Sequence, residues 1–362
     1  FGKCDCNFCN LLQNPAQPDL MRQTNRGKDQ MPITLQDVAA RAGVSKSAVS
    51  RTYTPGASVS AKTRAKVEAA AKELGYFPNV LASSLTTGRT TLVGLISNNF
   101  TNPYFLEIFD HFTRALQDAD LRPLLINLSA EEDASKSLSM LRQYNVDGVI
   151  VASSTLPPDF AKVFHDAGLP VVHAFGWSSE APQTARVSID NREAGHLAAQ
   201  TLLERGYTRV GFLGGPQSAA TTGDRLSGFQ AELATHGLCP EIQFAAAYSY
   251  EAGRAGMSRA LQTTPDVEAW FCGDDVIAIG AMDAAQAFGR RIPDDLGLIG
   301  LNDMNMAGWD RIALTTIRQP VKEIVSTSVN LIRQGIETPK AAPQMVLLPC
   351  ALVERGTLRA KH

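Results

Sequence analysis

The sequence predicts a small all-α head at the N-terminus, followed by a much larger two-lobed α/β body with parallel sheets. Residues 34–75 contain short helical patterns separated by single glycines. From residue 92 onward, apolar strand-like runs alternate with helical segments of about 10–15 residues. The charge divides in the same way: residues 31–90 carry eight Lys or Arg and three Asp or Glu, whereas residues 91–362 carry 22 and 30.

The overall composition is that of a globular protein, with 44% hydrophobic and 19% charged residues and a net charge of −2 over 362 residues. This length is typical of two or three domains. No apolar run approaches the roughly 20 residues of a membrane span, and the N-terminus lacks the pattern of a secretory signal. A basic head on an acidic body indicates a nucleic-acid-binding domain joined to a domain with another task.

Residues 1–30 are expected to form a disordered leader, because they are rich in Gln, Asn, Pro and charge and show no period. Cys4, Cys6 and Cys9 lie close together, but no fourth Cys or His is near, so no metal site is predicted. Met31 opens the first patterned segment and is a plausible natural start. The remaining cysteines are far apart and are expected to be reduced thiols: Cys239, Cys272 and Cys350.

The first helix of the head is predicted to begin after Thr34, which can cap it, with Asp37 in the capping-box position. Gly43 suits a left-handed turn at its end. Its apolar face is formed by Leu35, Val38 and Ala39.

A second helix follows, with Ser45 as its cap and Ala48 and Val49 facing inward. The two helices around Gly43 have the helix-turn-helix layout. Short hydroxyl donors and cations on the outer face of the second helix suit the reading of base edges in a major groove: Lys46, Ser47, Ser50 and Arg51. The alternative is an ordinary helical hairpin with a solvated face.

A third helix is predicted between the cap Ser60 and Gly75, with Val67, Ala70, Ala71 and Leu74 packing on the first two. Residues 78–88 could form two helical turns. A helix of that length is marginal alone, so this segment is expected to fold only against DNA or a partner chain.

Residues 32–88 resemble the head of the lactose-repressor/purine-repressor (LacI) family of bacterial transcription regulators. The motifs "TLQDVAARAGVS", "AVSR", "VSAKTRAKVEAAAKELGY" and "PNVLASSL" occur in family order and at family spacing. The resemblance continues to about residue 358. It implies a helix-turn-helix head over 31–77, a hinge helix and linker over 78–90, and an effector-binding and dimerisation domain over 91–358.

The resemblance also implies roles in DNA binding. Lys46, Ser47 and Arg51 would meet base edges in the major groove. Phosphate contacts would come from Thr34, Ser45, Ser50, Ser60, Thr63 and Tyr76. In the hinge, Asn79 and Ala82 would lie at the DNA, and Leu85 would be the wedge between base steps of the minor groove. Two residues depart from the family: Ala48 replaces the usual Thr, and Thr54 replaces Asn.

The body shows two successive series of strands. Runs at 91–97, 122–128, 146–153, 170–175 and 185–191 are followed by runs at 209–215, 269–275 and 296–303. Helices are predicted over 103–118, 131–144, 191–205, 224–236 and 276–288. Two such series imply two parallel sheets in two lobes, and a ligand between the loops at the carboxyl ends of their strands. The family body resembles periplasmic sugar-binding proteins, which implies that residues 318–345 return to the first lobe and the last strand joins the second.

The candidate effector residues of the first lobe follow its first strand. Asn102 offers a donor and an acceptor, and Tyr104 and Phe105 offer flat faces for a sugar ring. The alternative is that the two aromatic residues only fill the core. Trp177, after the strand at 170–175, either closes over the ligand or covers a strand end.

The second lobe contributes Arg225, the strongest single candidate, because a fixed guanidinium can bind hydroxyl pairs or a carboxylate. The alternative is an exposed cation in the first turn of a helix. Thr221 lies on the same loop. By the resemblance Asp274 occupies an effector position, with Asp275 capping the next helix, and Asn302 replaces the usual Asp. Asp190 and Gln319 lie at the crossovers between lobes and have either a ligand or a structural role.

Together these features predict a cytoplasmic, homodimeric repressor. Its partners would be a palindromic double-stranded DNA operator and a small-molecule effector, a sugar or sugar acid. The chain ends without a heptad leucine tail, which favours a dimer over a tetramer. A transport-type sugar-binding protein and an enzyme are the alternatives. The first is disfavoured by the head and the missing signal, and the second by the lack of Walker, HExxH and GxSxG motifs. No catalytic residue, metal or cofactor is predicted.

Overall fold

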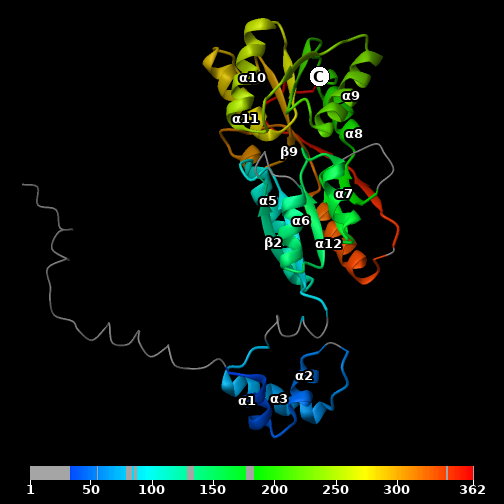
Figure 1. Cartoon of the computed structure of the whole chain (residues 1–362). Helices are drawn as coiled ribbons and strands as arrows, with labels where there is room; N and C mark the ends of the chain where they lie inside the picture. Colours follow the sequence, from blue (N-terminus) through cyan, green and yellow to red (C-terminus); the bar gives the residue numbers. More distant parts are fainter. Residues whose placement is uncertain are drawn as a thin grey trace, which may run out of the picture. The chain divides into compact units, whose positions relative to one another are not determined.

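The computed structural model describes residues 33–54, 56–78, 84, 88–128, 134–176, 183–339 and 341–361. The chain divides into two compact units, residues 1–88 and 89–362 (Figure 1). Four predicted site residues lie outside the described residues, as does the predicted leader: Asn79, Ala82, Leu85 and Trp177.

The head contains α1 (Leu35–Ala42), α2 (Lys46–Thr52) and α3 (Ala61–Leu74). The predicted capping box is present, because the Thr34 side chain accepts from the Asp37 N–H while the Asp37 carboxylate accepts from the Thr34 N–H. Gly43, at φ 64°, ends α1 in the left-handed conformation that glycine adopts without strain. The core of the head consists of Val38, Ala39, Val49, Val67, Ala70 and Ala71.

The body contains two six-stranded sheets. In lobe 1 the order is β11-β5-β4-β3-β1-β2, with all neighbours parallel. Its strands are β1 (Leu92–Ser97), β2 (Arg122–Asn127), β3 (Gly148–Ala152), β4 (Val171–Ala174), β5 (Ala185–Ile189) and β11 (Met345–Leu348). In lobe 2 the order is β12-β10-β9-β8-β6-β7, and only β12 runs antiparallel to its neighbour. Its strands are β6 (Val210–Gly214), β7 (Glu241–Phe244), β8 (Ala269–Cys272), β9 (Gly297–Asn302), β10 (Thr316–Arg318) and β12 (Ala351–Val353).

Helices cover both faces of the lobe 1 sheet, as expected for parallel strands. Leu95 belongs to the core shared with α5 (Pro103–Asp118) and α12 (Val321–Glu337). Its neighbour Ile96 belongs to the core shared with α6 (Ala134–Gln143) and α7 (Pro158–Asp166). Successive strand residues therefore pack on opposite faces.

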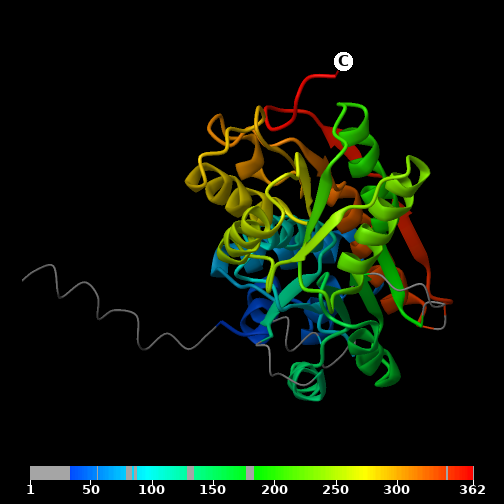
Figure 2. The same ribbon diagram turned by 90° about the horizontal axis from the view of Figure 1, so that it is seen from above.

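Lobe 2 has the same layering. Phe212 packs with α8 (Asn191–Leu203) and α9 (Ala220–Thr235), whereas Leu213 packs with α10 (Tyr250–Thr263) and α11 (Asp275–Ala287). Figure 2 shows the two helix pairs on either side of the lobe 2 strands. A short 3-10 helix, η2 (Asn305–Gly308), follows β9. The carboxyl ends of both sheets are thus the edges from which ligand-binding loops arise.

Two local predictions were wrong. Helix α9 begins at Ala220, so Arg225 lies in its second turn and not in the first. Asp274, not Asp275, caps α11, because the Asp274 Oδ1 accepts from the Val276 N–H at 2.8 Å. The elements α7, β7, α10, η2, β10, α12 and β11 were not predicted as helices or strands.

The described cysteines Cys239, Cys272 and Cys350 are free thiols, as expected. No helix in the described part of the chain has both the length and the apolar character that a membrane crossing requires. Within those same residues, no group of three or more His, Cys, Asp or Glu is placed to hold a metal ion.

Candidate functional site

The outer face of α2 presents unpaired cations. Lys46, Ser47 and Arg51 are exposed, and Ser50 is half-buried. Among the described residues, neither Lys46 nor Arg51 takes part in an ion pair or a hydrogen bond from its side chain. Such free cations on a short helix suit contacts with phosphates and base edges.

The hydroxyl groups predicted to contact phosphates shape the starts of the helices. Thr34, Ser45 and Ser60 are the caps of α1, α2 and α3. The Thr63 Oγ1 lies 2.9 Å from the Ser60 Oγ, and Tyr76 packs against Tyr53 with ring centroids 6.2 Å apart. These side chains therefore have structural roles in the head, and their contacts with DNA stay predictions.

A cavity between the two lobes gathers most of the predicted effector residues. Its free volume is about 10 Å³, room for a single water molecule. It is lined by Tyr104, Phe105, Ser154, Phe175, Ser188, Asn191, Arg225, Asp274, Asn302 and Gln319. Asn102 and Thr221 do not line it but contact its wall. Tyr104 and Phe105 also belong to the hydrophobic core, so the core interpretation is confirmed, and their contact with a ligand stays a prediction.

Four lining residues were missed from the sequence: Ser154, Phe175, Ser188 and Asn191. Ser154, Phe175 and Ser188 lie at or just after the carboxyl ends of β3, β4 and β5. Asn191 is the first residue of α8, directly after the crossover residue Asp190. Their positions at or next to the carboxyl ends of predicted strands could have identified them as candidate site residues. Asp190 itself is exposed and caps α8, which gives it a structural role.

A chain of amides surrounds the Asp274 carboxylate. The Asp274 Oδ2 accepts from the Asn102 Nδ2 at 3.1 Å and from the Asn302 Nδ2 at 2.9 Å. The Asn302 Oδ1 in turn accepts from the Gln319 Nε2 at 2.6 Å. Because Asn302 both donates and accepts here, it links Gln319 to Asp274 in a way that an ionised Asp could not.

Burial raises the pKa values of two adjacent carboxyl groups. The pKa of Asp274 rises to about 6 through loss of solvent, against the opposing effects of the Val276 N–H and the charge of Arg225. The pKa of Asp275 rises to about 7 for the same reason, although its oxygens accept from the Thr316 Oγ1 and the Met304 N–H. Burial in this part of lobe 2 therefore favours the protonated form of both carboxyl groups.

Arg225 is buried, with 4% of its surface exposed. Its Nε donates to the Asn191 Oδ1 at 2.8 Å and its Nη1 donates to the Gly273 carbonyl at 2.7 Å. The side chain is thus held between the start of α8 and the end of β8, and it is not the exposed cation of the alternative interpretation.

Among the described residues, three hydrogen bonds cross between the lobes. Besides the bond from Asn102 to Asp274, the Thr221 Oγ1 donates to the Ser154 carbonyl at 3.1 Å. The Asn305 N–H donates to the Glu107 Oε1 at 3.0 Å. A ligand larger than water fits the cavity only if the lobes separate, which breaks contacts of this kind.

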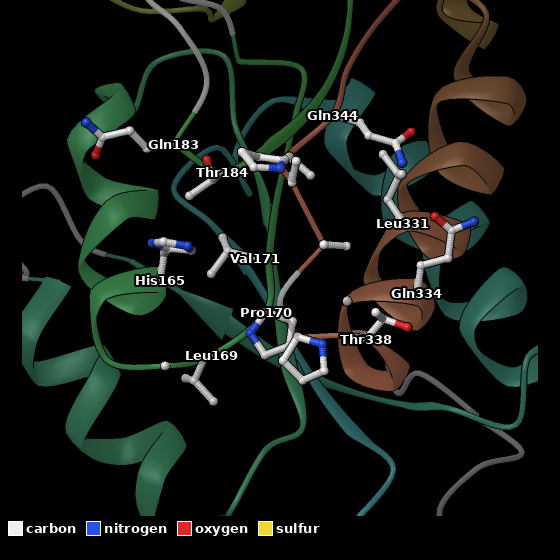
Figure 3. A pocket seen from close by; sticks show the side chains of 17 residues that line it. His165, Leu169, Pro170, Val171, Gln183, Thr184, Leu331, Gln334, Thr338 and Gln344 are labelled. Atoms are coloured by element: carbon white, nitrogen blue, oxygen red, sulfur yellow. The ribbon is translucent and has the colours of Figure 1, made fainter.

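A second cavity, of about 240 Å³, lies within lobe 1. Figure 3 shows His165 on one side of it and Leu331 and Gln334 of α12 on the other. It lies by Val171 and Ala185, where β4 and β5 begin. Ligands of parallel sheets bind at the carboxyl ends of strands, and this cavity is lined by no buried charged side chain, so the smaller cavity between the lobes is the better candidate.

Comparison with known proteins identifies both units. Residues 34–79 match the model of bacterial regulatory proteins of the lacI family. Residues 90–356 match periplasmic binding proteins and the sugar binding domain of the LacI family. The chain belongs to the LacI family of bacterial regulatory proteins.

Relatives of this LacI-family protein cover nearly the whole chain. It is 33% identical to the HTH-type transcriptional repressor PurR of Yersinia enterocolitica, over 90% of this chain and 96% of PurR. The dimer of the lac repressor bound to operator and the anti-inducer ONPF has a TM-score of 0.81 at 27% identity, covering 91% of this chain and all of that one. A complex of the transcriptional regulator CelR with cellobiose has a TM-score of 0.69 at 29% identity, covering 90% and 99%.

These findings confirm the predicted fold class and support a regulatory role over a transport role. The protein is a transcriptional regulator with a helix-turn-helix DNA-binding domain and an effector-binding body, and not a transport protein. The named relatives are repressors and regulators, not enzymes.

Proposed function

We propose that this LacI-family protein is a cytoplasmic, homodimeric repressor that binds a palindromic operator and responds to a sugar or sugar acid held between the lobes of its body. The proposal rests on one observation above all: residues from both lobes converge on one buried polar cavity. The relatives named above include a repressor dimer bound to an operator and a regulator bound to cellobiose. We assign no catalytic residue and no cofactor.

The head supports the DNA-binding part of the proposal. Lys46 and Arg51 are exposed and free of acidic partners among the described residues, whereas Arg41 on α1 is paired with Glu73 on α3. Lys46 and Arg51 are therefore available for DNA, as are the exposed lysines of α3 such as Lys72. We assign the base contacts to Lys46, Ser47 and Arg51, and the phosphate contacts to Thr34, Ser45, Ser50, Ser60, Thr63 and Tyr76.

The body supports the effector part. The flat rings of Tyr104, Phe105 and Phe175 lie on the lobe 1 side of the cavity, and Arg225, Asp274 and Asn302 lie on the lobe 2 side. Aromatic faces with a few fixed polar groups are typical of carbohydrate sites. Binding that changes the lobe contacts would change the operator affinity of the dimer, because the ligand favours one of two arrangements.

Exposed apolar side chains support self-association. Leu106 on α5 is 59% exposed and Leu125 on the edge strand β2 is 48% exposed. The elements α5 and β2 pack on one another, so both side chains belong to one region of lobe 1. We propose that these two side chains belong to the surface through which two protomers associate. A dimer also lets two heads bind one palindrome, which multiplies their affinity.

The DNA-binding assignment is tested by replacing one lysine at a time. We expect Lys46→Ala to weaken binding to an operator selected from random DNA by about 1–3 kcal/mol, with two chains bound per site in the wild type. The matched control is Lys72→Ala on α3, which removes the same charge from another exposed position of the head. Electrophoretic mobility shifts would measure both variants. Equal losses from the two would refute the assignment of α2 as the reading helix.

A further inference from the structure

The buried guanidinium of Arg225 lacks an anionic partner. Its two hydrogen bonds go to neutral acceptors, the Asn191 Oδ1 and the Gly273 carbonyl. Among the described residues, no ion pair involves Arg225 and its Nη2 makes no hydrogen bond. A buried charge is costly unless it is paired, so this arrangement is stable only with compensation from elsewhere.

The Asp274 carboxylate in the cavity wall does not form an ion pair with Arg225. Asp274 accepts from the Val276 N–H with Oδ1 and from two amides with Oδ2. Its position at the N-terminus of α11 stabilises its charge further. Three of the roughly four acceptor sites of this carboxylate are therefore already used within the protein.

Most of the polar groups that remain free at the cavity can donate hydrogen bonds. Three buried atoms there make no hydrogen bond within the described structure: the Tyr104 Oη, the Ser188 Oγ and the Asn191 Nδ2. Their residues are 3%, 1% and 2% exposed. Buried polar atoms are nearly always paired, so three such atoms around one cavity point to a bound partner. The amide and the Arg225 Nη2 can only donate, and the two hydroxyl groups can donate.

We infer, building on the proposed function, that the effector is a sugar acid whose carboxylate binds Arg225 together with the free donors of Asn191, Ser188 and Tyr104. A carboxylate only accepts hydrogen bonds, at about four lone-pair sites, which matches a set of free donors. It also compensates the guanidinium by a charge-assisted bond. A neutral sugar would leave the buried guanidinium without an anionic partner.

The test compares each hexose with its own hexuronate, for example galactose with galacturonate and glucose with glucuronate. The two members of a pair differ in one group, a hydroxymethyl against a carboxylate. Thermal shift and calorimetry on the full chain should show binding of a hexuronate at least about 10-fold tighter than of its hexose. Neutral sugars that bind as tightly as their acids, or a panel without any bound acid, would overturn the inference.

A charge-neutralising variant sharpens the test. Asn191→Asp keeps the acceptor for the Arg225 Nε but replaces the free Nδ2 by a carboxylate oxygen, so that Arg225 gains an ion pair within the protein. We expect the affinity for the hexuronate to fall about 10-fold or more, while the melting temperature without ligand stays the same or rises. An acidic residue also suits the first turn of α8, so the variant should fold. Unchanged hexuronate affinity would contradict the role of Arg225.

The two proposals fail separately. If a neutral sugar binds and changes operator affinity, the protein is a ligand-controlled repressor and only the anionic class is wrong. If the wild-type chain selects no operator, the proposed function is wrong whatever the ligand panel shows.

Discussion

The two lobes of the body have the same layering but different helix packing. In lobe 2, glycines bring paired helices into backbone contact. A Cβ on Gly195 or Gly228 would lie 2.0 or 1.9 Å from a carbonyl oxygen of the other helix of the α8–α9 pair. In lobe 1, a Cβ on Gly94 or Gly148 would instead meet flexible side-chain atoms, at 2.7 and 2.9 Å.

The lobes also divide the polar chemistry of the cavity. Lobe 1 contributes rings and hydroxyl groups, whereas lobe 2 contributes the charged groups Arg225 and Asp274. The bond from Arg225 on α9 to Asn191 on α8 bridges the glycine-packed helix pair. The tight packing in lobe 2 therefore fixes the geometry of its guanidinium.

The largest expected effect comes from breaking the glycine contact. We expect Gly228→Ala to lower the free energy of unfolding by about 2–3 kcal/mol, because its Cβ would overlap the Arg192 carbonyl and force α8 and α9 apart. Ligand affinity should fall as well, since Arg225 would move away from Asn191. Urea denaturation and calorimetry would measure the two effects.

The same helix provides a control. Gly223 on α9 is exposed, and a Cβ there would meet nothing within 4 Å. Gly223→Ala should therefore stabilise the protein, by about 0.5–1 kcal/mol, through the higher helix propensity of alanine. If Gly228→Ala were as well tolerated as Gly223→Ala, the contrast between the lobes would have no energetic basis.

The sequence was sufficient for the parts of the molecule that follow local rules. Caps such as Thr34 and Ser45 and the strand–helix alternation depend on neighbouring residues, and these predictions were confirmed. Asp275 was misassigned because two adjacent acidic residues can each cap a helix. Only the fold shows that Asp275 turns toward Thr316, 41 residues away.

Part of the candidate site could also be predicted from the sequence. Arg225 and Asp274 could be assigned by resemblance, and they do line the cavity. Ser188 and Asn191 are ordinary polar residues in their local sequence. Their free donors become visible only when β5 and α8 are packed beside Arg225 and the lack of a partner can be seen.

The next largest expected effect is on the pH dependence of stability, to which a buried titratable group in each lobe contributes. Folding raises the pKa of Asp275 to about 7, so its contribution to stability is lost as pH rises toward that value. In lobe 1, burial lowers the pKa of His173 to about 4, so its contribution is lost as pH falls below its ordinary value near 6.5. The two lobes therefore respond to pH with opposite signs.

Substitutions at the two positions can show this difference in sign. Asp275→Asn should gain stability relative to wild type as pH rises from 5 to 8, by about 1–2 kcal/mol. Its amide can accept from the Met304 N–H and donate to the Thr316 hydroxyl. His173→Gln should gain relative to wild type as pH falls from 7 to 5. Thermal unfolding at several pH values would measure both effects. If the stability of Asp275→Asn depended on pH in the same way as that of wild type, the Asp275 carboxyl group would not be the source of the pH dependence.

The smallest expected effect concerns the hydroxyl group of Tyr104 in lobe 1. This group is buried and makes no hydrogen bond within the described residues, so Tyr104→Phe should leave the free energy of unfolding within about 1 kcal/mol of wild type, or raise it. The ring stays in its edge contact with Phe175, at a centroid distance of 6.2 Å, and the core is preserved. Effector affinity should fall by about 3- to 10-fold, the loss expected for one hydrogen bond. Calorimetry with the bound hexuronate gives the affinity, and urea denaturation gives the stability. A loss of stability with no change in affinity would mean that the hydroxyl group has a partner inside the folded protein, and lobe 1 would then contribute only its apolar faces to the site.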